Sequence, residues 1–413
     1  MKMGEAGKTV RLGVVGLGGR GMGQVRTLLQ MPDVEISCVC DVYEDRVQKG
    51  RELVASQRPY TPDGETDYTK LIARSDVDAV VVFSSWETHI DVCVRAMLAG
   101  KRAATEVGGA NSLEDCWRLV RTFESTGVEC MMLENCCYGK EEMTLLNMVR
   151  QGLFGEIVHC EGGYRHDLRD EIGLGDVNRH YRQRHFLNRN GELYPTHELG
   201  PIAKYLNINR GNRMVSLVSM ASRAAGLHAW LKQHRPDTPL ADAQVNEGDV
   251  VTTLIKCANG ETIQLNHDCT LPRPYSRAGV IQGTKGIWME DNRSIYIEDM
   301  SPGDNGHWTH RWESDEEYMK RYEHPLWKEY EVFGLRGGHG GMDYLALRAF
   351  VESVQKNETP PIDTYDTASW MAITALSEES VAMGSMPVPI PDFTGGRWLQ
   401  ERHSRATGEY ALD

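Results

Sequence analysis

The sequence predicts an α/β fold in two parts: a doubly wound parallel sheet over residues 1–135, then over 136–413 an α+β domain with a large open, mostly antiparallel sheet. Three observations predict it. A glycine-rich turn follows a short apolar strand near the N-terminus. Apolar strands then alternate with amphipathic helices, and after about residue 136 strand-like segments follow one another with few helices between them. A length of 413 residues suits two domains of ordinary size.

The first element is the segment "VRLGVVGLGGRGMGQVRTLLQ", which reads as a strand, a glycine turn and a helix. Gly16, Gly18 and Gly21 have the GxGxxG spacing, which allows a tight turn, a close approach of a pyrophosphate and close helix packing. The next strand, "VEISCVCD", ends at Asp41, whose carboxylate suits a ribose diol and would repel a 2′-phosphate. These features favour a Rossmann domain that binds NAD rather than NADP, and the alternative is a purely structural glycine turn.

The next elements continue the alternation. Strands are predicted over 77–85, 102–107 and 128–135, with helices over 89–100 and 112–127 between them. In a parallel sheet, ligands lie beyond the carboxyl ends of the strands. We therefore expect one crevice to be lined by the residues that end these strands: the "SSWETH" segment at 84–89, Glu106, Val107 and Asn135.

The second part of the chain is predominantly strand-like. The predicted strands are 155–164, 213–222, 248–269 with a hairpin turn at 258–260, 277–290 and 293–299. Two helices are predicted over 342–357 and 367–384. The Gly-, Trp- and His-rich stretch 301–341 is predicted to form long loops.

Composition excludes some classes of function. The formal net charge of −14 argues against nucleic acid as a partner, because phosphate binding needs clustered Lys and Arg. The ten cysteines show neither CxxC pairs nor a zinc-type spacing, so we expect free, mostly buried thiols in a reducing compartment. The first residues contain no signal-peptide pattern, and the longest apolar run, "AVVVF", is too short to cross a bilayer. We expect a cytoplasmic protein with no membrane partner.

The stretch "NGELYPTHELG" places Tyr194 and His197 three residues apart, far from the glycine turn. A histidine titrates near neutrality, so His197 could take up and return a proton, and Tyr194 could act with it as an acid or base. The alternative is that His197 only packs against or caps the helix that follows.

Several strings resemble a known family. A Rossmann domain followed by an open antiparallel sheet resembles the Gfo/Idh/MocA oxidoreductases over nearly the whole chain. The strings "NCCYG", "GYRHDLR", "NRNGELYPTHELGPIAKYLNINRGNRM" and "GGHGGMDY" are more specific and resemble glycoside hydrolase family 109. That resemblance implies an NAD-dependent α-N-acetylgalactosaminidase with a small-molecule glycoside as substrate. The enzyme would oxidise C3 of the sugar. The sugar would then lose its C2 proton and the aglycone, add water, and be reduced again at C3.

Two departures from the ordinary dehydrogenase pattern are shared with this glycosidase family. Val107 stands where a typical member carries the lysine of Glu-Lys-Pro, and Leu193 stands where an aspartate precedes the histidine. Both favour a glycosidase over a sugar dehydrogenase. Two alternatives stay open: an NAD-dependent sugar or inositol dehydrogenase, and a non-catalytic sensor of nucleotides or sugars.

The resemblance also implies site residues. Tyr194 and His197 would be catalytic, and Tyr164, Arg182 and Tyr275 would bind substrate with them; each of these three could instead be a packed aromatic or a surface arginine. The cofactor residues would be Gly16, Gly18, Gly19, Arg20, Gly21, Asp41, Trp86, Glu87, Thr88, His89, Glu106, Val107 and Asn135. His339 could join the site or form a helix-entry turn. His307 and His310 are weak metal candidates, so no metal is expected. We expect a homo-oligomer.

Overall fold

A computed structural model of the chain describes residues 7–301, 311–400, 406 and 408–412. It divides into two compact units. Unit 1 is formed by Met1–Lys140, Pro325–Met371 and Gln400–Asp413, and unit 2 by Glu141–His324 and Ala372–Leu399. The domain boundary at residue 135 stays a prediction. The prediction placed residues 325–371 in the second domain, whereas in the structure they pack with the N-terminal part of the chain.

The core of unit 1 is a six-stranded parallel sheet in the order β3-β2-β1-β4-β5-β6. Its strands are β1 (Val10–Val15), β2 (Val34–Cys40), β3 (Asp63–Glu65), β4 (Ala79–Val82), β5 (Arg102–Thr105) and β6 (Cys130–Met132). The chain order reverses at β1, which pairs with β2 on one side and β4 on the other. Ligands bind beside such a switch point in doubly wound sheets. The predicted parallel sheet is confirmed.

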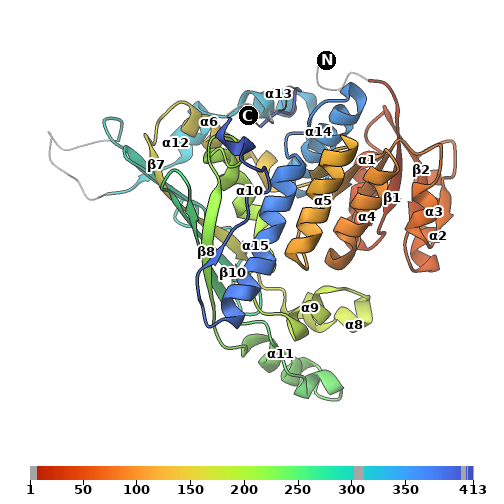
Figure 1. Cartoon of the computed structure of the whole chain (residues 1–413), viewed down its shortest axis with the longest axis horizontal. Coiled ribbons are helices and arrows are strands. Elements are labelled where there is room, and N and C mark those ends of the chain that lie inside the picture. The colour runs from red at the N-terminus through yellow and green to blue at the C-terminus, as the bar shows by residue number, and fades with distance from the viewer. Residues whose placement is uncertain (1–6, 302–310, 401–405, 407, 413) are drawn as a thin grey trace. The chain divides into compact units, whose positions relative to one another are not determined.

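Helices of unit 1 form two groups. Helix α1 contacts α2 and α14, whereas α4 contacts α3 and α5 (Figure 1). Their bounds are α1 (Gly19–Leu28), α2 (Glu44–Ala55), α3 (Tyr68–Ile72), α4 (Trp86–Leu98), α5 (Leu113–Thr126), η1 (Asn135–Tyr138), α13 (Pro325–Phe333), η3 (His339–Gly341) and α14 (Met342–Lys356). Ser112 caps α5 at its N-terminus, and Gly127, in the left-handed conformation, ends it.

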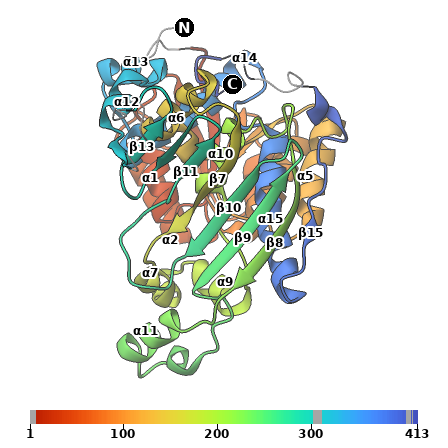
Figure 2. The ribbon, with the colours of Figure 1, turned by 90° about the vertical axis from the view of Figure 1, so that its left-hand side faces the viewer.

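The core of unit 2 is a nine-stranded sheet in the order β14-β13-β12-β11-β7-β10-β9-β8-β15 (Figure 2). Its strands are β7 (Ile157–Arg165), β8 (Met214–Ala221), β9 (Val250–Cys257), β10 (Thr262–Asp268), β11 (Val280–Gly283), β12 (Gly286–Met289), β13 (Ser294–Ile297), β14 (Glu313–Ser314) and β15 (Val388–Pro389). Only the β7–β10 pair is parallel among the described strands. The prediction of a mostly antiparallel sheet is confirmed.

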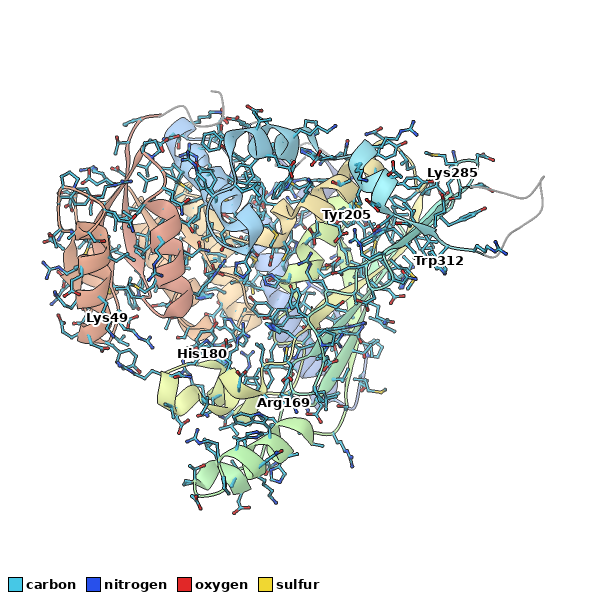
Figure 3. The ribbon with its side chains drawn as sticks, turned by 180° about the vertical axis from the view of Figure 1, so that it is seen from behind. Lys49, Arg169, His180, Tyr205, Lys285 and Trp312 are labelled. Atoms are coloured by element: carbon cyan, nitrogen blue, oxygen red, sulfur yellow. The ribbon has the colours of Figure 1, made fainter. Side chains whose placement is uncertain are left out.

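Unit 2 also contains short helices, several of them between β7 and β8. They are α7 (Arg169–Gly173), α8 (Gly175–Asn178), α9 (Arg182–Asn188), α10 (Thr196–Tyr205), α11 (Gly226–His234), η2 (Pro239–Asp242), α12 (Glu316–Arg321) and η4 (Arg397–Leu399). Figure 3 labels Arg169 and His180, which mark the α7–α9 segment. Helix α6 (Lys140–Arg150) starts at the end of unit 1, and α15 (Thr364–Ala382) passes from unit 1 to unit 2 after Met371.

One prediction about local structure is wrong. The stretch 301–341 was expected to be loops, but it contains α12 and α13. The glycines on both sides of these helices dominate the composition, although "EEYMKR" itself has an acidic first turn and a basic last turn, as helices prefer.

All ten cysteines are buried, and none of them forms a disulfide. None of the helices in the described ranges is long and apolar enough to span a membrane.

Candidate active site

The glycine turn joins β1 to α1. Gly16 has a φ of 97°, and a Cβ there would lie 2.5 Å from the backbone of Phe83. A Cβ on Gly21 would collide with the carbonyl oxygen of Gly16, whereas one on Gly19 would meet nothing within 4 Å. Gly18 is the N-cap of α1, so the first-turn N–H groups lie beside open space. The turn is therefore closely packed at Gly16 and Gly21 and open at Gly19, and the open side suits a pyrophosphate.

Asp41 at the end of β2 is tied to this turn. Its Oδ2 accepts a hydrogen bond from the Leu17 N–H at 2.7 Å, and its Oδ1 accepts one from the Tyr43 N–H at 3.0 Å. Each carboxylate oxygen can accept a second hydrogen bond. Asp41 can thus fix the turn and still accept from a ribose hydroxyl.

Arg20, Glu106 and Asn135, three predicted cofactor residues, meet in one buried network. The Arg20 Nε donates to Glu106 Oε1 at 2.6 Å, and its two Nη atoms donate to the Asp343 carboxylate at 2.8 and 2.9 Å. The Asn135 Nδ2 donates to Asp343 at 2.7 Å. His339 Nδ1 also lies 2.9 Å from Asp343, so the histidine belongs to this network.

Asp343 was missed by the sequence analysis. It begins α14, and it joins residues more than 200 positions away. Burial alone would lower the pKa of Arg20, but the carboxylates of Glu106 and Asp343 raise it. Conversely, burial alone would raise the pKa of Asp343, but hydrogen bonds from His339 and Arg20 hold it far below its usual range. Arg20 and Asp343 therefore form an ion pair, and the sequence signal for Asp343 was an aspartate after a glycine-rich loop.

The "WETH" residues 86–89 form the first turn of α4. Thr88 Oγ1 donates to the Ser85 carbonyl at 2.8 Å, and His89 Nε2 lies 3.0 Å from the carbonyl oxygen of Ser84. Glu87 is half-buried. Thr88 and His89 therefore hold the end of β4 in place.

Trp86 and Val107 are both buried. Gly108 has a φ of 139°, and a Cβ there would collide with the Trp86 indole. This close approach explains the glycine after Val107 in "TEVGG".

The centre of the unit 2 site is an aromatic cluster where β7 meets α10. The rings of Tyr164 and Tyr194 have centroids 4.4 Å apart, and the His197 ring lies 5.4 Å from the first and 4.9 Å from the second. The Tyr194 hydroxyl lies 3.4 Å from His197 Nε2. Leu193, by contrast, is fully buried. The sequence-predicted pair is thus brought together with Tyr164.

Gly162 makes this approach possible. A Cβ on Gly162 would overlap Cγ of Glu198, which follows His197 in α10. Helix α10 therefore packs on β7 at a position where no side chain fits. The glycine sets how closely His197 approaches Tyr164.

Replacing Gly162 by alanine is expected to push α10 away from β7. Overpacking of this kind costs about 1–3 kcal/mol, so the melting temperature should fall together with turnover. Gly23→Ala is the matched control, since a Cβ on Gly23 meets nothing within 4 Å and alanine favours its helix. Differential scanning calorimetry measures both variants. An unchanged melting temperature and rate in Gly162→Ala would contradict the packing argument.

Arg182 lies over this cluster. Its guanidinium carbon is 5.0 Å from the ring centroid of Tyr194 and 5.7 Å from that of Tyr164, and its Nη1 is 3.2 Å from Glu171. Burial alone would lower the pKa of Arg182, but Tyr164, Tyr181 and Glu171 raise it. The cluster therefore contains a permanent cation, which can stabilise developing negative charge.

Tyr275 and His166 complete the cluster. The Tyr275 side chain is 46 % exposed, and its ring lies 5.1 Å from His166 and 6.2 Å from Tyr164. The Tyr164 hydroxyl lies 3.0 Å from His166 Nδ1. His166 was not among the predicted site residues. Its closeness in sequence offered the signal, because His166 follows β7 directly and lies two positions from Tyr164.

A buried polar group supports the loop before α10. His267 Nδ1 lies 3.0 Å from Glu247 Oε1, and Glu247 Oε2 accepts from the Gly191 N–H at 3.0 Å. The Tyr194 N–H donates to Glu192 at 3.3 Å. Burial alone would lower the pKa of His267, but Cys269 and then the Glu247 carboxylate raise it. This ion pair anchors the loop that carries Tyr194.

His307 and His310 lie outside the described residues.

Two family models match the chain. Residues 138–400 match "Glycosyl hydrolase 109, C-terminal domain", and residues 10–134 match "Oxidoreductase family, NAD-binding Rossmann fold".

The chain is similar to curated proteins over most of its length. It is 38 % identical to an α-N-acetylgalactosaminidase of Tannerella forsythia, covering 97 % of this chain and 89 % of that protein. It is 40 % identical to a glycosyl hydrolase family 109 protein of Stenotrophomonas maltophilia, covering 96 % and 91 %. Among solved structures, a levoglucosan dehydrogenase in complex with NADH and levoglucosan has a TM-score of 0.70 at 16 % identity, covering 93 % of this chain and 100 % of that one. This last similarity concerns the fold alone.

Proposed function

The chain belongs to glycosyl hydrolase family 109, and from that premise we propose that it is an NAD-dependent glycosidase acting on N-acetylgalactosaminides or related glycosides. The observation that carries the proposal is the Tyr194–His197 pair, packed on Tyr164 beneath the Arg182 guanidinium. Such a cluster offers proton donors, acceptors and a fixed cation. Most glycosidases use two carboxylates that flank the glycosidic bond. A reaction that passes through a sugar ketone does not need them.

We propose NAD as the cofactor of unit 1. Its support is the match of residues 10–134 to an NAD-binding fold, the open space above Gly19 and the remaining hydrogen-bond capacity of Asp41. A 2′-phosphate would be repelled by that carboxylate. When bound, NAD supplies a reversible hydride acceptor for C3 of the sugar, so the reaction has no net redox change. Arg20, Glu106 and Asn135 are proposed to shape its site.

The residues of unit 2 are proposed to handle the protons. A C3 ketone makes the C2–H bond acidic, and His197 or Tyr194 removes that proton. The Arg182 guanidinium holds the sugar and stabilises negative charge on the enolate oxygen. Loss of the C1 substituent, addition of water and return of the C2 proton complete hydrolysis. Tyr275 lines the exposed side of the cluster.

A two-signal assay tests this function. The purified protein is incubated with chromogenic α- and β-glycosides, and separately with free sugars and NAD⁺, while aglycone and NADH are followed independently. Release of aglycone without accumulation of NADH is expected. NADH accumulating from free sugar alone would instead identify a dehydrogenase, and the absence of both signals would identify a non-catalytic protein.

Isotope exchange gives a second readout of the same proposal. Substrate labelled with deuterium at C2 should lose the label to water, because the C2–H bond breaks in each turnover. A glycosidase that uses direct displacement would retain the label.

We also propose that the open sheet of unit 2 joins a second copy of the chain. Its outward face carries Met220 and Leu254, with side chains 65 % and 46 % exposed. Exposed apolar patches of this kind mark protein interfaces.

A further inference from the structure

The unit 2 cluster contains a second tyrosine–histidine pair, which the function proposed above does not use. Tyr164 lies near the end of β7 and His166 follows the strand, with 3.0 Å between the Tyr164 hydroxyl and His166 Nδ1. The two rings are nearly perpendicular, with centroids 5.6 Å apart. This contact is shorter than the 3.4 Å between the Tyr194 hydroxyl and His197 Nε2. The site thus has two separate hydroxyl–imidazole pairs.

The two pairs occupy different parts of the cluster. Tyr164 and Tyr194 are both buried, and His166 lies against the half-exposed ring of Tyr275, with 5.1 Å between the ring centroids. An aglycone departs toward solvent, and the water that replaces it arrives from solvent. The Tyr164–His166 pair is therefore on the side where the bond between C1 and the aglycone would be broken.

The electrostatics of the second pair suit a proton donor. Burial raises the pKa of Tyr164, so the phenol keeps its hydrogen at neutral pH. Burial, with help from the Arg182 cation, lowers the pKa of His166, so its imidazole is neutral. A neutral imidazole carries one N–H. In the Nδ1–H form it donates to the Tyr164 oxygen and leaves the phenol hydrogen free to point at substrate.

We propose that Tyr164 donates a proton to the departing aglycone oxygen and that His166 is the positioning residue for that hydroxyl. The proposal rests on the glycosidase function. The C1–O bond breaks with its electron pair on the aglycone oxygen, which takes the Tyr164 hydrogen. The phenolate left behind is stabilised by the His166 N–H and by Arg182, 5.7 Å from its ring centroid. When water adds to C1, its proton returns to Tyr164.

Leaving-group dependence tests the donor. A 4-nitrophenyl glycoside releases a stabilised phenolate that needs no proton, whereas a methyl glycoside releases an alkoxide that does. Tyr164→Phe is expected to lower kcat on the methyl glycoside by about 100-fold or more beyond any loss that it causes on the 4-nitrophenyl glycoside. It should still wash C2-deuterium into water, since another group breaks that bond. An equal loss on both substrates, or loss of the washout, overturns the proposal.

His166 variants test the positioning role. His166→Asn keeps an N–H donor near the Nδ1 position, and His166→Leu removes it. The asparagine variant should recover at least 10-fold of the methyl-glycoside activity lost in the leucine variant, while the 4-nitrophenyl rates of the two remain similar. Equal rates of the two variants on the methyl glycoside overturn the role of His166. Absence of aglycone release by the unmodified protein from either glycoside overturns the proposed function itself, and this inference with it.

Discussion

His197→Ala and Tyr194→Phe are each expected to lower turnover by about 10²–10⁴-fold, the range that positioned acid–base groups contribute. The two side chains lie within 3.4 Å of each other and against the Tyr164 ring, so either loss removes a partner in proton transfer. Bound NAD should be retained, because the proposed cofactor residues are in unit 1. Aglycone release measures the rate, and absorbance of the purified protein measures the cofactor.

Matched controls separate chemistry from packing. Tyr322→Phe and His234→Ala make the same chemical changes outside the cluster, where Tyr322 stacks on Tyr318 and His234 on Trp230. Both should keep nearly full rates. The double variant at 194 and 197 should lose little more than the worse single variant, because residues that act as a unit are non-additive. Full activity in both single variants would show that the acid–base assignment is wrong.

The parts of this fold that the sequence predicted depend on short-range signals. The glycine turn, Asp41 and the strand–helix alternation are each legible within about thirty residues, and each is confirmed as structure. Tyr194 and His197 were also predictable as a pair, because only three positions of sequence separate them. The short helices α7 to α9 were not, because 4–7 residues give too few turns to show a periodicity.

The contacts that sequence reasoning missed are set by tertiary packing. Asp343 meets Arg20 because α14 packs against α1, across more than 300 residues of chain. Glu247 meets His267 because β10 returns antiparallel to β9, with His267 opposite Val251. No local pattern marks either contact. His166 differs, since it lies only two positions from Tyr164, directly after β7.

Glu192→Gln is expected to make the protein more stable at alkaline pH. Glu192 is completely buried, and its Oε2 has no hydrogen-bond partner among the described residues. Burial raises the pKa of this carboxyl to about 7. The charge of His267 lowers the pKa in part, and the charge of Glu247 raises it further. In the unfolded chain a glutamate titrates near about 4.3. Folding therefore favours the protonated form.

The sign of the pH dependence follows directly. Because the pKa is higher in the folded state, the stabilising contribution is complete below about pH 4.3, falls as pH rises, and is lost above about pH 7. The difference amounts to about 4 kcal/mol in the free energy of unfolding. Glutamine has no proton to lose, so Glu192→Gln should match the unmodified protein near pH 5 and exceed it by up to that amount at pH 8.

Thermal unfolding at the two pH values measures this difference, with Glu298→Gln as the control because Glu298 is exposed. A stability gain that is the same at pH 5 and pH 8 would contradict a buried titrating carboxyl. The variant should also keep its turnover, because the amide oxygen of the introduced glutamine can still accept the Tyr194 N–H. A stable and active Glu192→Gln protein would show that the carboxylate supports the loop through its shape and hydrogen bond, and that its charge only destabilises the fold.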